Sequence, residues 1–240
     1  MEIMGHRGAA GVAPENTMPA FKVSADLGIP WVELDIRLTK DGDLVLLHDK
    51  SLERTTDGTG EVGQLTVAEI QKLDAGSWFS ADFAGVRVPT LVQVLETFQE
   101  RIQFNIEIKD EDDRLEEQIA RLFEILDRHQ LRHRVILSSF KKKILGAVRE
   151  EDERVQLAII ANQSADQMKR IATELSCQMM NPGNKILSEP LIKWAHERGK
   201  RITGWMANEK EILHLLNQWN VDYCCTDFPG MAQEYLEELP

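Results

Sequence analysis

Cysteine is scarce in this chain of 240 residues, which contains only Cys177, Cys224 and Cys225. Because the number is odd and two of them are adjacent, they do not form a framework of disulfides. The first residues, MEIMGHRGAAG, lack the charged start and the long apolar run of a signal peptide. No apolar run approaches the roughly 20 residues that span a bilayer. We therefore expect a cytoplasmic protein with no integral membrane segment.

Positive charge is also in short supply. The chain has 28 Lys and Arg residues against 40 Asp and Glu residues, which gives a net charge of -12 at pH 7. Nucleic acids and anionic membranes require a basic surface, so both are disfavoured as partners. A small anionic substrate would require the positive charge to be concentrated at one place. No partner motif is evident on the predicted exposed faces, and the sequence does not specify an oligomeric state.

Short apolar runs alternate with amphipathic helical patterns along the whole chain. The main strands are expected near residues 3, 34, 106, 137, 159, 179, 203 and 224, with helices between them. Alternating β and α elements imply a parallel sheet, and eight units imply a closed (β/α)8 TIM barrel, here a single α/β domain over residues 1–240. The main competitor is an open doubly wound sheet. The barrel is favoured because GHRGAAG lacks the spacing of a dinucleotide-binding turn.

One segment, at about residues 50–89, interrupts this rhythm after the second strand. It is rich in Gly, Thr, Asp and Ser, and it includes the turn-rich run TTDGTGEVG. A long segment between a strand and its helix usually forms a cap over the functional end of a barrel, although it can be a mere excursion. We predict a small inserted cap subdomain, because its root lies at His48. Earlier in the chain, we expect Asn16 to cap the helix that runs towards Gly28.

Two acidic residues lie within the apolar run WVELDI at residues 31–36. Side chains alternate along a strand, so Glu33 and Asp35 face the same way. In the later strand FNIEIK, Glu107 and Lys109 likewise share one face. Active sites of barrels form at the carboxyl ends of the strands, so the three acids should converge there.

Three converging carboxylates form a hard, all-oxygen site. Such a ligand set suits Mg²⁺ or Ca²⁺, whereas Zn²⁺ prefers His or Cys. The alternative is a structural ion network in which the acids pair with Arg7, Arg37 and Lys109. Acids from two adjacent strands on one face, beside two histidines, favour the metal site.

Two histidines are expected at the same end of the barrel, His6 after the first strand and His48 at the root of the insertion. Imidazoles suit general acid–base chemistry near neutral pH, although either one alone would more often have an ordinary hydrogen-bonded role. Arg7 and Lys109 add positive charge around one spot. Cations that neutralise oxygens, with one imidazole to take a proton and another to give one, are what a phosphoryl group requires.

Ten short segments, spread from the first strand to the last, carry a family resemblance. They are HRG (6–8), APENT (13–17), ELD (33–35), TKDGDLVLLHD (39–49), RTTDGTG (54–60), VPTL (88–91), NIEIK (105–109), SSF (138–140), WMAN (205–208) and TDFPG (226–230). With these segments the chain resembles the glycerophosphodiester phosphodiesterase family. It departs from the family pattern at Met18-Pro19 and at Cys224-Cys225, neither of which is a proposed ligand.

The resemblance implies a TIM-type barrel with a small inserted subdomain. It also implies hydrolysis of glycerophosphodiesters to sn-glycerol 3-phosphate and an alcohol, with a divalent cation. The residues that it assigns are the metal ligands Glu33, Asp35 and Glu107, the acid–base pair His6 and His48, and the substrate-binding residues Arg7, Lys109 and Trp205. We take His6 provisionally as the base and His48 as the acid. Trp205 would cover the glycerol carbons, and plain barrel core is nearly as common a role for such a residue.

Two other functions compete with this interpretation. A lysophospholipase D would use the same site beside an apolar groove, which Leu52, Trp78, Phe79, Phe83 and Val86 of the insertion are able to form. A non-catalytic phosphate-binding protein of the same fold is disfavoured, because both histidines and all three acids are present. The nucleophile stays open between water and the glycerol 2-hydroxyl, which would give a cyclic phosphate. The sequence does not specify the alcohol head group.

Overall fold

The computed structural model describes residues 1–109 and 112–238, and nine strands in this part of the chain form one sheet. The strands are β1 (Glu2–Gly5), β2 (Trp31–Leu38), β3 (Leu44–Leu46), β4 (Gln103–Ile108), β5 (Ile136–Ser139), β6 (Gln156–Ala161), β7 (Met179–Pro182), β8 (Arg201–Gly204) and β9 (Tyr223–Thr226). All except β3 pair in parallel with both neighbours, and β1 pairs with both β9 and β2, which closes the ring. The predicted (β/α)8 barrel is confirmed.

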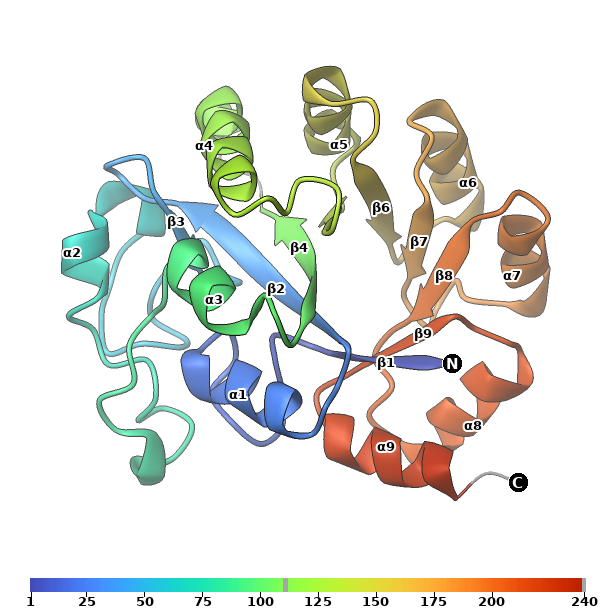
Figure 1. Ribbon diagram of the computed structural model, residues 1–240, viewed down its shortest axis with the longest axis horizontal. Coiled ribbons are helices and arrows are strands. Elements are labelled where there is room, and N and C mark those ends of the chain that lie inside the picture. Colours follow the sequence, from blue (N-terminus) through green and yellow to red (C-terminus); the bar gives the residue numbers. More distant parts are fainter. Residues whose placement is uncertain (110–111, 239–240) are drawn as a thin grey trace.

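Helices of the described residues surround this ring of strands, as Figure 1 shows. They are α1 (Met18–Asp26), α3 (Leu91–Phe98), α4 (Leu115–Arg128), α5 (Lys142–Glu151), α6 (Ala165–Glu174), α7 (Glu189–His196), α8 (Lys210–Gln218) and α9 (Pro229–Glu237). The shorter elements are α2 (Val67–Ile70) and the 3₁₀ turns η1 (Val62–Gln64), η2 (Ala81–Phe83) and η3 (Asp112–Arg114). Each barrel strand is thus followed by a helix that returns the chain to the same end of the barrel.

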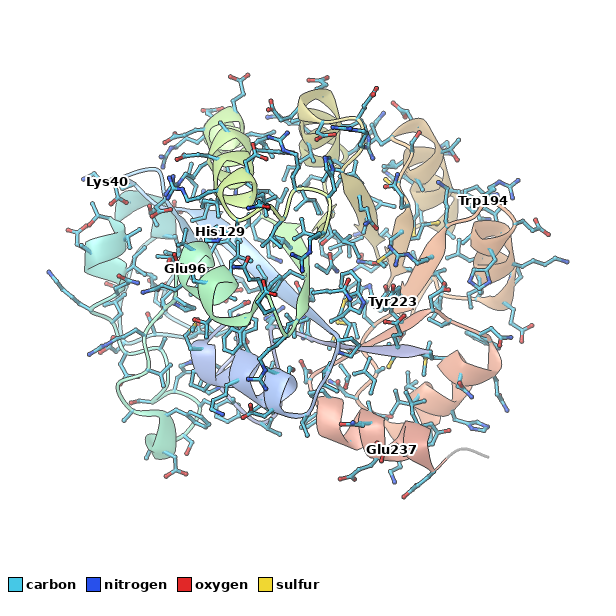
Figure 2. All side chains as sticks on the ribbon, in the orientation of Figure 1. Lys40, Glu96, His129, Trp194, Tyr223 and Glu237 are labelled. Carbon is cyan, nitrogen blue, oxygen red and sulfur yellow. The ribbon has the colours of Figure 1, made fainter. Side chains whose placement is uncertain are left out.

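Side chains on each strand alternate between the helices and the barrel interior. Leu34, Ile106 and Leu137 belong to the large core between strands and helices. A smaller cluster fills the barrel interior and comprises Met4, Trp31, Ile136, Ala158, Met179, Tyr223 and Cys225. In Figure 2, side chains fill the ring around Tyr223, while Lys40 and Glu237 lie at the outer surface. This alternation decides which residues of a strand can reach the functional end from inside.

The pairing register brings the acidic residues of two strands to the same level. Glu33 lies opposite Asn105, and Asp35 lies opposite Glu107. Because the intervening Leu34 packs against the helices, Glu33 and Asp35 both point towards the barrel axis. The expected convergence of acids from β2 and β4 is therefore a direct result of the strand pairing.

Residues 50–89 lie between β3 and α3, at the periphery of the barrel in Figure 1. Strand β3 pairs antiparallel with β2 and does not take part in the ring. The segment shares a compact apolar cluster with β3, made of Val45, Leu47, Leu52, Val62, Ile70, Ala75 and Val88. This cluster is separate from the two cores of the barrel, so the segment is packed locally as well as against the barrel.

The prediction that Asn16 caps helix α1 is wrong. The helix begins at Met18, with Thr17 at its N-cap position and no side-chain capping hydrogen bond. Asn16 has a φ of 57°, in the left-handed region that Asn tolerates better than most residues. Its side-chain amide instead donates to Oδ2 of Asp35 at 2.8 Å, and its Oδ1 accepts from the Asp35 amide. The tertiary contact with β2 takes the place of the local cap.

Candidate active site

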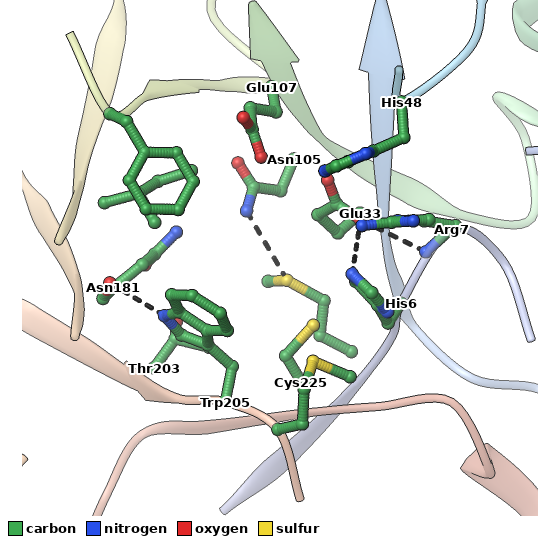
Figure 3. Close-up of a pocket in the computed structure, with 14 residues that line it drawn as sticks. His6, Arg7, Glu33, His48, Asn105, Glu107, Asn181, Thr203, Trp205 and Cys225 are labelled. Carbon is green, nitrogen blue, oxygen red and sulfur yellow. Dashed lines mark hydrogen bonds and ion pairs between the residues drawn. The ribbon is translucent and has the colours of Figure 1, made fainter. Parts of the chain in front are cut away.

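A pocket of about 500 Å³ opens at the carboxyl ends of the barrel strands (Figure 3). It is lined by Met4, His6, Arg7, Glu33, His48, Asn105, Glu107, Phe140, Ile160, Asn181, Thr203, Trp205, Met206 and Cys225. Six of the eight predicted site residues are in this set. The other two, Asp35 and Lys109, contact them directly, and Lys109 lines an adjoining groove. The structure thus brings all eight predicted residues together.

The three acids form one buried group. Glu33, Asp35 and Glu107 are 6%, 1% and 8% exposed, and each offers an oxygen within 4.8 Å of the others. Two cations lie among them. Lys109 Nζ is 2.8 Å from Asp35 Oδ1 and 2.5 Å from Glu107 Oε1, and Arg7 Nε is 3.2 Å from Asp35 Oδ2. The predicted acid cluster is therefore present together with the Arg7 and Lys109 parts of the predicted ion network, whereas Arg37 donates to the His48 carbonyl.

Charge balance decides whether this group suits a metal ion. Burial, followed by the neighbouring Asp35 and Glu107, raises the pKa of Glu33 well above its usual value. Burial and then Asp35 raise the pKa of Glu107 to about 7. Burial also opposes the ionisation of Asp35, but Lys109 and Arg7 together lower its pKa. When all three carboxyls ionise they carry one negative charge more than the two cations balance, and an all-oxygen donor set of this kind fits a hard divalent cation.

The loop after β1 is shaped so that its backbone reaches the acids. Arg7 and Gly8 have φ values of 49° and 86°, both in the left-handed region. In this conformation the Arg7 amide donates to Oε2 of Glu33 at 3.1 Å. The Arg7 guanidinium donates to Oε1 of Glu15 at 2.7 Å, which fixes its direction. Figure 3 shows His6, Arg7 and Glu33 on one side of the pocket.

His6 is oriented by a carboxylate that directly follows the last barrel strand. Its Nδ1 lies 2.6 Å from Oδ1 of Asp227, and its Nε2 lies 3.9 Å from Oε2 of Glu33. Asp227 is held in turn, because Nδ2 of Asn208 donates to its Oδ2 at 2.6 Å. Burial disfavours the charged form of Asp227, but His6 and Asn208 lower its pKa. An anionic Asp227 keeps the proton on Nδ1 and directs Nε2 towards the acid cluster.

His48 has the same arrangement on the other side of the acids. Its Nδ1 lies 2.6 Å from Oδ1 of Asp49. Arg54, from the inserted segment, binds Asp49 and also donates to both carboxylate oxygens of Glu15. Burial lowers the pKa of His48, and the nearby Lys109 adds to this effect although Asp35 opposes it. Burial therefore favours the neutral form of this imidazole.

The opposite wall of the pocket is mostly apolar. The Trp205 indole donates to the carbonyl of Asn181 at 2.9 Å, and the Phe140 ring packs edge-on against it with centroids 6.0 Å apart. Cys225 also faces the pocket, where burial and then Glu33 raise the pKa of its thiol well above the usual value. Cys225 therefore acts as a small neutral wall residue.

Sequence reasoning did not assign roles to three residues that hold the site together, namely Asp227, Asn208 and Arg54. Asp227 lies far along the chain from His6, and Arg54 lies far from Glu15, so only the fold brings these pairs close. The signal was nevertheless present, since each lies in a segment that carries the family resemblance: TDFPG, WMAN and RTTDGTG.

The fold and the site define a TIM-barrel enzyme with a carboxylate and histidine centre of the kind used for phosphoryl transfer. The model of the glycerophosphoryl diester phosphodiesterase family matches residues 6–231. The chain is 32% identical over 228 residues to a glycerophosphodiester phosphodiesterase of Caldanaerobacter subterraneus, covering 95% of this chain and 94% of that one. It is also 32% identical over 243 residues to a glycerophosphodiester phosphodiesterase of Bacillus altitudinis, covering 99% of each.

Among solved structures, a phosphodiesterase of Oleispira antarctica in complex with the product sn-glycerol-3-phosphate has a TM-score of 0.94. It is 26% identical, and the match covers 99% of this chain and 97% of that one. The chain therefore belongs to the glycerophosphoryl diester phosphodiesterase family, and its enzyme class is that of the phosphodiester hydrolases. Within the described residues, no helix is both long and apolar enough to cross a membrane. The cytoplasmic location stays a prediction.

Proposed function

We propose that this enzyme hydrolyses glycerophosphodiesters to sn-glycerol 3-phosphate and an alcohol, with Mg²⁺ or Ca²⁺ held by Glu33, Asp35 and Glu107. The observation that carries the proposal is the group of three buried carboxylates beside two histidines at a single pocket. The product bound in the structure of the Oleispira antarctica phosphodiesterase, sn-glycerol-3-phosphate, supports the same class of substrate.

The positive groups of the site suit a phosphodiester. A divalent cation bound by the three acids would supply charge that neutralises the phosphate oxygens. Arg7 lines the pocket and Lys109 borders it, so we assign both side chains to the same oxygens. A guanidinium and an ammonium at such a position stabilise the negative charge that develops as the ester bond breaks.

The two histidines carry the proton transfers. Each has its Nδ1 on a carboxylate, which leaves Nε2 as the nitrogen that exchanges a proton with the substrate. The lowered pKa of His48 supports the base role for this residue, with His6 as the acid that protonates the departing alcohol. This order is the reverse of the one adopted provisionally from the sequence. Trapping a cyclic glycerol phosphate during turnover would identify the 2-hydroxyl as the nucleophile, and its absence would favour water.

We further propose that residues 1–240 form one domain and that residues 50–89 act as its cap. Two contacts support this role. Arg54 of the insertion binds Glu15, which holds Arg7, and it binds Asp49, which holds His48. The insertion therefore helps to position a phosphate-binding residue and a proton-transfer residue at once.

The test is an assay for released sn-glycerol 3-phosphate from glycerophosphocholine, with and without EDTA. We expect release that EDTA abolishes and that added Mg²⁺ or Ca²⁺ restores. If no sn-glycerol 3-phosphate is released under any condition, the result favours the alternative interpretation, a non-catalytic phosphate-binding protein.

Lysophospholipase D activity would require the insertion to offer an apolar groove beside the pocket. Three of the candidate rings contact one another, because Trp78 with Phe79 and Phe79 with Phe83 meet edge-on at centroid distances of 5.7 and 5.6 Å, and Trp78 is also 40% exposed. Leu52 is buried in the insertion cluster. Comparing glycerophosphocholine with lysophosphatidylcholine separates the two activities, and we expect the former to be the better substrate.

A further inference from the structure

Two buried amide side chains border the pocket without a role in the proposed chemistry. Asn105 on β4 is 1% exposed, and Asn181 on β7 is 4% exposed. The Oδ1 atom of each is buried and has no hydrogen-bond partner. Buried side-chain oxygens are nearly always hydrogen-bonded, so two exceptions in one pocket require an explanation.

The geometry of the two amides points to a ligand rather than to loose packing. Both side chains line the pocket and face its interior, Asn105 beside Glu107 and Asn181 beside Trp205 (Figure 3). The Nδ2 atom of Asn105 is occupied by a contact of 3.6 Å to Met4 Sδ. The backbone carbonyl of Asn181 accepts the indole hydrogen bond of Trp205. The side chain of Asn105 is therefore held at its nitrogen and the backbone of Asn181 is held by Trp205, while the Oδ1 atom of each has no partner.

The two Oδ1 atoms lie in a part of the pocket that is mostly apolar. The pocket is otherwise lined here by Met4, Phe140, Ile160, Thr203, Trp205, Met206 and Cys225, and the Thr203 hydroxyl donates to Met179 Sδ. An apolar pocket with two isolated acceptors fits a molecule that offers hydroxyl donors on a short carbon chain. Glu33 and Glu107 of the acid group line the same pocket, and Glu33 lies opposite Asn105 in the strand pairing.

We propose that Asn105 and Asn181 are specificity-determining residues that accept hydrogen bonds from the free hydroxyls of a small polyol. The inference rests on the proposed function, in which that polyol is the glycerol of the diester. Trp205 covers its carbons while the two amide oxygens bind its hydroxyls. A site built to bind a hydroxyl rejects an analogue without it, because the buried acceptor is then left unpaired. Diesters with acylated glycerol hydroxyls are correspondingly poor substrates.

The experiment compares two ligands that differ only in hydroxyl groups, sn-glycerol 3-phosphate and n-propyl phosphate. Their dissociation constants are measured by calorimetry on the full chain with Mg²⁺, and again with Ca²⁺. We expect the wild type to prefer sn-glycerol 3-phosphate by on the order of 10- to 100-fold. In Asn105→Leu and Asn181→Leu the preference falls to about threefold or less, while affinity for n-propyl phosphate is kept.

Gln118 provides a matched control. It is a fully buried amide on α4 whose side-chain atoms also lack partners, but it does not line the pocket. Gln118→Leu should keep the wild-type preference. If a Leu variant fails to fold by circular dichroism, Asn105→Ser and Asn181→Ser remove the amide with less change of shape, and the same loss is expected.

Equal binding of the two ligands by the wild type overturns the inference, whatever the variants do. So does a preference that survives in both Asn variants. Hydrolysis of glycerophosphocholine is measured on the same wild-type sample. Hydrolysis without a hydroxyl preference overturns this inference and leaves the proposed function intact, whereas absence of hydrolysis overturns the proposed function itself.

Discussion

At the scale of single residues, the site is a pair of histidines held by carboxylates on either side of a buried acid group. His6 and His48 have different partners but the same geometry, with Nδ1 2.6 Å from an aspartate oxygen. Removing one member of an acid–base pair costs about 10²- to 10⁴-fold in rate. We therefore expect a loss of kcat in that range for His6→Ala and for His48→Ala, measured by sn-glycerol 3-phosphate release. Near-normal kcat in both variants would refute the assignment.

Asp227 should act as a positioning residue for His6. Asp227→Asn keeps the size of the side chain but removes the charge that holds the proton on Nδ1, so the imidazole can take the wrong tautomer. We expect kcat to fall at least about tenfold, with little change in KM.

The chain contains a matched control for this variant. Nε2 of His196 lies 2.9 Å from Oδ2 of Asp222, outside the pocket. Asp222→Asn should leave kcat unchanged. An equal loss of kcat in both variants would attribute the effect to a general loss of structure, and a normal kcat in Asp227→Asn would show that His6 needs no carboxylate.

At the scale of elements, the strands and helices of the barrel could be predicted because each has its own local signal. The alternation in WVELDI and FNIEIK fixed the faces of β2 and β4, and the strand pairing then aligned Asp35 with Glu107. Asn16 could not be placed in this way. Its sequence position suits a helix cap, but a contact with Asp35 on β2 decides its conformation.

Contacts between residues of distant elements could not be predicted from local sequence patterns. Asp227 lies 221 positions from His6, and Arg54 lies 39 positions from Glu15. Nothing in the periodicity of either segment indicates these contacts, because they depend on ring closure and on the path of the insertion. Motif resemblance marked the segments as important without giving the role of each residue.

The loop from β1 to α1 depends on a glycine for both shape and space. Gly8 has a φ of 86°, and a Cβ there would lie 2.7 Å from the Ala20 carbonyl carbon. We expect Gly8→Ala to destabilise the fold by about 1–3 kcal/mol, since it combines backbone strain with a clash against α1. Because His6 and Arg7 precede it, kcat should fall as well. Denaturant unfolding and the product assay measure both effects.

Gly146 is the control for that substitution. It lies within α5, and a Cβ there would meet nothing within 4 Å. Gly146→Ala should stabilise the protein by about 0.5–1 kcal/mol through helix propensity and leave kcat unchanged. If Gly8→Ala were as stable and active as Gly146→Ala, the loop geometry would not have the importance given to it.

At the scale of the whole molecule, this acidic protein places carboxyls that are hard to ionise at the mouth of its barrel. The pKa of Glu107 is raised to about 7 in the fold, above the value for an exposed glutamate. A carboxyl whose pKa is higher in the fold than in the unfolded chain makes the fold less stable as the pH rises from the unfolded pKa towards the folded one. The reason is that the unfolded chain ionises first. Glu33 is shifted in the same direction. A bound cation reverses this loss.

Metal binding should therefore depend on pH. Below about pH 7 the cation has to displace a proton from Glu107, so its affinity rises with pH and levels off above that value. We expect Mg²⁺ or Ca²⁺ to raise the melting temperature more at pH 8 than at pH 5. Glu107→Gln should reduce this difference. An equal shift at both pH values would mean that the cation binds elsewhere.

The central claim is that Glu33, Asp35 and Glu107 share one divalent cation. The most direct test is a crystal structure of the protein soaked in Mn²⁺, with anomalous differences recorded at the manganese edge. The account predicts a peak within coordination distance of all three carboxylates. A map with no peak there, and with Lys109 still joining Asp35 to Glu107 as in the ion-pair network, would contradict it.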